Sequence, residues 1–141
     1  MTAALRVLLV IGVVVCFGIG GWAQFAPESF YFGFPTVDLT PPYSEHLVRD
    51  YGGATLGLGI PLVAAIVWPE TKLVIVAAAA YLMFAIPHSV FHFHHLDHAT
   101  SGEAALIVTE TIASLLLPAA IVVIAVVRMR RERPHRDPAL G

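Results

Sequence analysis

The sequence is poor in charged residues. Aspartate, glutamate, lysine and arginine together make up 13% of its 141 residues, well below the share of roughly 25% that is typical of a soluble domain. Hydrophobic residues make up 57%, and they are gathered into long blocks with the charges between them. This distribution indicates a membrane protein rather than a soluble globule, because a bilayer core requires long uncharged blocks.

Cysteine and several familiar motifs are also scarce or absent. Cys16 is the one cysteine, so an intrachain disulfide is excluded. No Walker motif, Rossmann glycine pattern or nucleophile elbow is present, so those nucleotide-binding and hydrolase classes have no support. We expect no nucleic-acid binding either, because most of the basic residues form a short C-terminal tail and no recognition module is visible.

Four blocks are apolar and long enough to cross a bilayer, for which about 20 residues suffice. They cover residues 3–23, 47–68, 73–92 and 103–127. The sequence therefore predicts an all-α integral membrane protein, with a four-helix transmembrane bundle in residues 1–127 and a basic tail in residues 128–141. The first block could instead be a cleaved signal peptide, but its apolar run is longer than a usual signal core, so we expect it to be retained.

Residues 24–46, between the first two spans, are rich in proline and aromatic residues. Proline opposes regular helix, and aromatic side chains favour the bilayer interface. We expect an ordered outer loop packed on the membrane surface, with at most a short helix.

The second span contains closely spaced glycines. Gly53 and Gly57 lie four residues apart, with Gly52 and Gly59 nearby. Small residues at this spacing allow two helices to approach closely.

The C-terminal tail gives the expected orientation. Five arginines lie within residues 128–136, directly after the fourth span, and basic residues beside a span stay in the cytoplasm. Four spans then place both termini in the cytoplasm, and they place loop 24–46 and the connector after the third span on the extracytoplasmic side. We therefore expect a multi-pass protein of the cell membrane.

Histidines are concentrated at the end of the third span. Five of the seven lie in the segment HSVFHFHHLDH, residues 88–98. One continuous helix would carry His88, His92 and His95 on one face, and His94 and His98 on another. Two imidazoles one helical turn apart can bind one metal ion, as in the HxxxH element of zinc helices.

The expected topology brings ionisable residues of other spans to the same depth, in the outer third of the bilayer. Ionisable residues at that depth usually face the bundle interior and are paired. The candidate metal ligands are His88, His92, Asp50 and Glu110, with His46, Glu45, His95 and His98 as outer candidates. Nitrogen and carboxylate ligands favour zinc, iron or manganese. Haem is disfavoured, because His46 alone could supply an axial ligand from another helix.

Two other interpretations of these polar residues stay open. Glu110 could pair with Arg49 or hydrogen-bond His88 in a purely structural network. The histidines could also relay protons or sense pH.

The segments HLVRDYGGATLGLG and AYLMFAIPHSVFHFHHLDH resemble small four-helix membrane proteins that are common in actinobacteria and form a family of unknown function. The resemblance covers the second and third spans well and the remainder loosely. It implies a four-helix bundle and no activity. It matches the family's polar and glycine positions to Arg49, Asp50, Gly52, Gly53, His88, His92, His95 and Asp97.

Three functions are compatible with this sequence. The favoured one is an accessory or structural subunit of a larger membrane complex. A four-span chain is expected to enclose little volume, and helix faces built from small residues could pack on partners, as at Gly53, Gly57 and residues 77–80. The alternatives are a metal-dependent membrane enzyme acting on a lipid-like substrate, and a carrier that binds a metal or a small molecule. The expected partners are the lipid bilayer and other membrane subunits.

Overall fold

The computed structural model describes residues 2–39, 42–97 and 99–132. Within these ranges all regular structure is helical. The helices α1, α3, α4 and α5 are long and apolar enough to cross a membrane, which confirms the predicted all-α fold with four spans. The elements are α1 (Ala3–Phe25), α2 (Pro27–Gly33), the 3-10 helix η1 (Val37–Leu39), α3 (Glu45–Val67), α4 (Thr71–Phe93) and α5 (Ser101–Glu132).

Local capping fixes where two of the long helices begin. The Ser44 hydroxyl accepts a hydrogen bond from the backbone N–H of Leu47, so α3 starts directly after Ser44. Before α5, the backbone N–H of Thr100 donates to the Glu103 carboxylate at 2.8 Å, and the Glu103 N–H donates back to the Thr100 hydroxyl at 3.4 Å. This reciprocal pair is a capping box.

The fourth span is longer than expected. Helix α5 continues to Glu132, so residues 128–132 of the predicted tail are helical. The rest of that tail, residues 133–141, lies outside the described residues.

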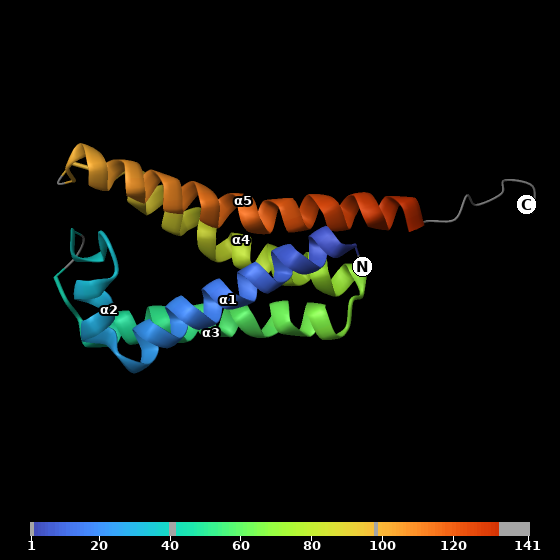
Figure 1. Cartoon of the computed structure of the whole chain (residues 1–141), viewed down its shortest axis with the longest axis horizontal. Helices are drawn as coiled ribbons and strands as arrows, with labels where there is room; N and C mark the ends of the chain where they lie inside the picture. Colours follow the sequence, from blue (N-terminus) through green and yellow to red (C-terminus); the bar gives the residue numbers. More distant parts are fainter. Residues whose placement is uncertain (1, 40–41, 98, 133–141) are drawn as a thin grey trace, which may run out of the picture.

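The long helices form two pairs. Helix α1 packs along α3, and α4 packs along α5, while contacts between α3 and α4 and between α1 and α5 join the pairs (Figure 1). We call the end of the bundle with α2, η1 and the α4–α5 connection the cap end, and the opposite end the tail end. The best-buried large side chains, Leu5, Leu9, Leu62, Val74 and Ile121, come from the tail-end half, and the two pairs diverge toward the cap end (Figure 1).

Glycine lets α1 approach α3 near the cap end. An ideal Cβ at Gly52 would lie 2.5 Å from the backbone nitrogen of Gln24, and one at Gly20 would lie 2.9 Å from the backbone of α3. By contrast, a Cβ at Gly57 would have no neighbour within 4 Å, and one at Gly53 would meet only a side-chain oxygen. The close approach therefore uses Gly52 rather than the Gly53–Gly57 pair, because neighbouring residues of a helix face different directions.

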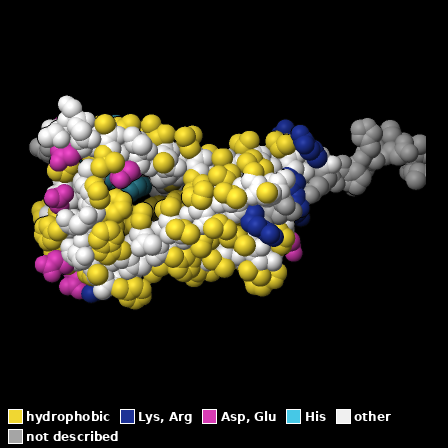
Figure 2. All heavy atoms as spheres, in the orientation of Figure 1, with side chains coloured by type: hydrophobic (Ala, Val, Ile, Leu, Met, Phe, Trp, Pro, Cys, Tyr) yellow, Lys and Arg dark blue, Asp and Glu magenta, His cyan; other side chains and the backbone are white. Residues whose placement is uncertain are grey.

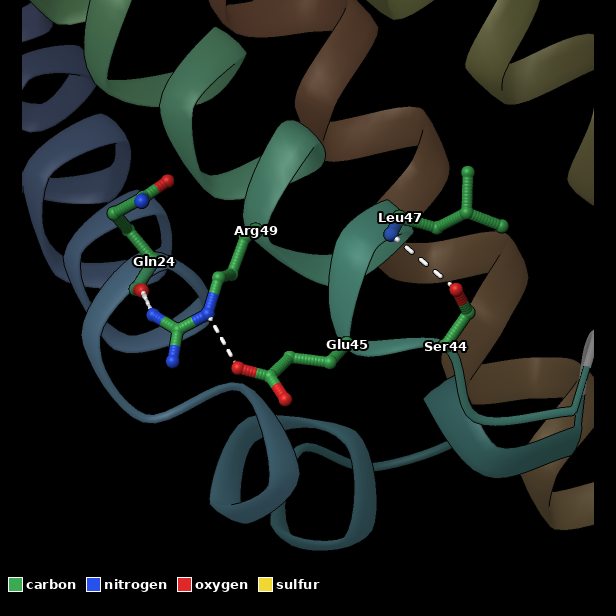
Figure 3. A network of polar contacts seen from close by, with 5 residues as sticks. All are labelled: Gln24, Ser44, Glu45, Leu47 and Arg49. Carbon is green, nitrogen blue, oxygen red and sulfur yellow. Dashed lines mark hydrogen bonds and ion pairs between the residues drawn. The ribbon is translucent and has the colours of Figure 1, made fainter.

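Arg49 fastens the end of α1 to α3 (Figure 3). Its guanidinium donates to the backbone carbonyl of Gln24, and its Nε donates to the Glu45 carboxylate at 2.8 Å. The last carbonyls of a helix lack donors within the helix, and a cation there interacts favourably with the helix dipole. Arg49 therefore caps α1 and makes none of the contacts with Glu110 that the sequence allowed.

Aromatic side chains hold α2 and the residue after it, Phe34, on the α1–α3 pair. The Trp22 and Phe30 ring centroids are 5.7 Å apart, those of Phe30 and Phe34 are 5.4 Å apart, and Phe30 stacks on Tyr51 at 5.8 Å. Among the described residues, α2 packs on α1, α3 and η1 and does not approach α4 or α5. The loop expected at residues 24–46 thus contains two short helices, and it leaves space on its α4–α5 side.

Candidate ligand cavity

A cavity of about 340 Å³ lies where the two helix pairs diverge. Figure 2 shows the bundle hollowed near its cap end, with a histidine and an acidic side chain lying in the hollow. Small-molecule sites in proteins usually occupy about 300–1,000 Å³. The cavity is lined from every helix by Val15, Ile19, Phe30, Tyr31, Phe34, Thr36, Val37, Pro42, Ser44, Leu47, Val48, Tyr51, Thr55, Leu58, Tyr81, Phe84, Ala85, His88, Phe91, His92, Ile107, Glu110, Thr111 and Ser114.

Aromatic rings form much of the wall and hold one histidine in place. The His88 ring stacks on Phe84 with 5.4 Å between centroids and 19° between planes, and on Tyr51 with 6.0 Å and 24°. The His92 ring lies edge-on to His88 at 4.5 Å. Because α3 supplies Tyr51 and α4 supplies the other three rings, this stack also joins the two helix pairs.

Several polar groups on the wall have no partner in the described part of the chain. Neither His88, His92 nor Glu110 makes a hydrogen bond or ion pair with another described residue, and the same holds for the hydroxyl of Tyr81, a residue that is only 6% exposed. Polar atoms that are reached from a cavity can form hydrogen bonds to water or to a ligand. These four groups are therefore available to hydrogen-bond a molecule that enters the cavity.

The polar groups lie well inside the helices that could span a membrane, rather than at the helix ends. At 1.5 Å per helical residue, His88 lies about 8 Å inside the cap end of α4 and Glu110 about 13 Å inside that of α5. Tyr81 and Ser114 are deeper, at about 18–20 Å by the same rise. Ionisable residues within a bilayer usually face the bundle interior, and the position of Glu110 on the cavity wall follows this rule.

The structure separates the predicted metal ligands into two groups. His88, His92 and Glu110 line the cavity, whereas Asp50 lies on the outer side of α3, with its carboxylate 3.3 Å from Nε2 of His46 and both side chains exposed. Tyr51, the next residue, faces the cavity. A helix turns by about 100° per residue, which is why Asp50 cannot share that direction.

The outer candidates are on the surface. Glu45 pairs with Arg49. The exposed His95 has its Nδ1 2.7 Å from the Phe91 carbonyl and stacks on the Phe91 ring at 4.0 Å, so it closes the last turn of α4 instead of facing the cavity. His98 lies outside the described residues.

A metal site is not assembled within residues 2–39, 42–97 and 99–132. Nowhere in these ranges are three or more histidine, cysteine, aspartate or glutamate side chains grouped so that they could hold a metal ion. The predicted set of four ligands is not brought together, because Asp50 points outward. Of the predicted ligands, His88, His92 and Glu110 share the cavity wall without being grouped closely enough to hold a metal ion, and a divalent metal stays a prediction.

Sequence reasoning missed the cavity-facing residues between the histidines. Tyr81, Phe84, His88 and His92 recur every three or four residues along α4, as do Ile107, Thr111 and Ser114 along α5. This spacing places each set on one helical face. The stripe of mixed aromatic and polar residues was the available signal, but in a membrane span it looks the same as ordinary helix packing.

Fold and cavity together define a class: a small helical membrane protein with a ligand-sized cavity at one end of its bundle. The chain belongs to the family described as domain of unknown function (DUF4345), whose family model matches residues 4–89. The match spans α1, α2, α3 and α4 as far as Ser89 and so includes His88, whereas α5 lies beyond it. No curated protein and no solved structure matches the chain.

Proposed function

We propose that this protein binds a small, mainly apolar molecule of the membrane in the cavity at its cap end. The observation that carries the proposal is a group of four polar side chains that make no hydrogen bond or ion pair with other described residues and are set in an aromatic wall: His88, His92, Glu110 and Tyr81. Ligand sites are typically apolar pockets with a few well-placed polar groups that orient the ligand.

The cavity changes the ranking of the functions considered from the sequence. The sequence favours an accessory subunit for two reasons, the small volume expected inside four spans and the small-residue faces that could pack on partners. The cavity of about 340 Å³ removes the first reason and leaves the second. The metal-dependent enzyme would need an assembled set of metal ligands, and no group of three such side chains exists among the described residues. Ligand binding is therefore what the geometry supports best.

The distribution of charge supports an extracytoplasmic cap end. Lysines and arginines gather at the tail end and acidic side chains at the cap end (Figure 2). Basic residues flanking spans are retained in the cytoplasm. Both described ends of the chain lie at the tail end (Figure 1), so the proposed topology has both termini inside the cell and has the cavity and the histidines on the outer side.

Ligand binding can be tested by filling the cavity. Ala85 lines the cavity and is 1% exposed, so Ala85→Phe should occupy the space that a ligand needs. Ala79, on the same helix, is exposed, and Ala79→Phe is the matched control. Each protein is purified in mild detergent, shown by circular dichroism to be helical, and extracted with organic solvent for mass spectrometry.

We expect one molecule to be recovered at about one per chain from the wild type and from Ala79→Phe, and to be lost in Ala85→Phe. If Ala85→Phe does not fold, Ser114→Leu narrows the same cavity from α5. Recovery of the same molecules from all variants, or of none from any, would sink the proposal. Other membrane chains purified at a fixed ratio, with no small molecule, would favour the subunit function instead.

A further inference from the structure

The charge of the cavity wall and the direction in which it opens identify the kind of molecule. We infer that the ligand is a single-chain lipid with a small uncharged hydroxyl or carbonyl head, which enters from the side of the bundle with its head first. This inference rests on the proposed function and names the ligand class for the same cavity.

The wall carries no cation. Among its described residues Glu110 is the one carboxylate, and neither lysine nor arginine is present. Phosphate groups are bound by arginine, lysine or helix N-termini, and an anionic head would also face the like charge of Glu110 when that group is ionised. Ser44 and Leu47 of the first turn of α3 also line the cavity, but the Leu47 N–H is occupied by the Ser44 hydroxyl. Without lysine or arginine, the wall suits an uncharged head better than a phospholipid, a lipid phosphate or a fatty-acid anion.

The same wall suits a hydroxyl or a carbonyl. A neutral imidazole has one nitrogen that donates and one that accepts, and a phenol does both. His88, His92 and the Tyr81 hydroxyl can thus either donate to a lipid oxygen or accept from a lipid hydroxyl. An uncharged head also avoids the cost of removing an ion from water, which the single, half-buried carboxylate of Glu110 would offset only in part, and only for a cationic head.

The cavity opens toward the hydrocarbon region. The long helices run along the horizontal axis of Figure 1, and in the same orientation Figure 2 shows the hollow on the side of the bundle, surrounded by hydrophobic side chains. Among the described residues α2 makes no contact with α4 or α5, so its backbone does not bridge the two helix pairs. A molecule entering here comes from lipid, so its head has to travel inward to reach Glu110 while its chain stays among apolar side chains.

The volume limits the number of chains. At about 340 Å³ the cavity lies near the lower end of the usual range for ligand sites, about 300–1,000 Å³. One chain with a small head fits this size better than the two chains of a membrane phospholipid.

Photo-crosslinking tests the head group and its direction together. The purified protein in lipid nanodiscs is irradiated with hexadecanol that carries a diazirine either beside the hydroxyl or at the far end of the chain. Matched probes with the diazirine beside the head are hexadecanoic acid, hexadecylamine and hexadecyl phosphate. Labelled peptides are identified by mass spectrometry, and an excess of unlabelled hexadecanol is the competitor.

We expect the hexadecanol probe with its diazirine beside the hydroxyl to label the segments around His88 and Glu110. Labelling should be at least about tenfold stronger than with the acid, amine or phosphate probes, which corresponds to about 1.4 kcal/mol. The far-end probe should label these segments less. Replacing the carboxyl in Glu110→Gln should narrow the difference between the alcohol and the phosphate, because it removes the like charge.

Two negative results have different meanings. Stronger labelling of these segments by a charged probe overturns the inferred head group. Stronger labelling by the far-end hexadecanol probe overturns the inferred direction of entry. Either result leaves the proposed function intact. An absence of competed labelling by every probe, with no difference between the wild type and Ala85→Phe, overturns the proposed function together with this inference.

Discussion

Replacing Gly52 with alanine is expected to push α1 away from α3. An ideal Cβ at Gly52 would lie 2.5 Å from the backbone nitrogen of Gln24 and 2.9 Å from the carbonyl carbon of Ala23, whereas ordinary contact begins at 3.4 Å. Both obstructing atoms belong to the backbone, so rotation of a side chain cannot relieve the clash. Helix α1 would have to move by roughly 1 Å, and close-packed interiors resist such shifts.

Gly57 provides the matched control on the same helix, because a Cβ there would have no neighbour within 4 Å. Both replacements gain the same helix propensity, about 1 kcal/mol for alanine over glycine, so this gain cancels in the comparison. The remaining difference is overpacking, typically about 1–3 kcal/mol. Gly59→Ala should fall between the two, because the ring of Phe17 that it would meet at 2.6 Å is a side chain that can rotate.

The comparison is made by unfolding the purified variants in mixed micelles of mild detergent and SDS, with helix content followed by circular dichroism. Gly52→Ala should be less stable than Gly57→Ala by about 1–3 kcal/mol, and the wild type gives the reference. Equal stabilities for the two alanine variants would show that α1 does not approach α3 at Gly52, and the pairing of these helices would then be wrong.

Three further outcomes are expected. Arg49→Ala should lower the free energy of unfolding in the same assay by about 1–2 kcal/mol, because it removes a charge-assisted hydrogen bond to α1. Glu45→Gln should lower it by less than about 0.5 kcal/mol, since it removes only an exposed ion pair. Equal losses for the two variants would refute the capping role of Arg49. The topology can be tested in a variant whose one cysteine, Cys16, is replaced by alanine. On intact cells, Glu28→Cys at the cap end should react with a membrane-impermeant maleimide, and Glu70→Cys at the tail end should not. The opposite pattern of labelling would show that the proposed topology is inverted. Elemental analysis of the purified protein should find less than one metal ion per chain, whereas a stoichiometric metal that is lost on replacing His88 would restore the metal site.

The spans could be predicted from the sequence because they depend on a local property. A bilayer core has a fixed thickness, so any run of about 20 apolar residues identifies a helix that can cross it. The ends of the helices are also local: Ser44 and the Thr100–Glu103 pair act on the backbone within three residues of themselves. These features need no knowledge of which helix packs on which.

The candidate site could be predicted only in part. His88, His92 and Glu110 were identified from their depth in the spans, and all three line the cavity. Asp50 lies at a similar depth but on the outer side of α3, paired with His46. Depth follows from position along a helix, whereas facing direction depends on the rotation of each helix about its axis, which the packing of its neighbours decides.

The sequence by itself determined that this protein has four apolar helices, that charge divides the two ends of the bundle, and that polar groups lie deep in its spans, because composition and helical rise are enough for each. Only the tertiary structure decided that Gly52 rather than Gly57 meets α1, that Arg49 caps α1, and that the helix pairs diverge around a cavity. These depend on contacts between residues far apart in the chain. A low content of charge marked the chain as a membrane protein, and packing decided where its few polar groups face.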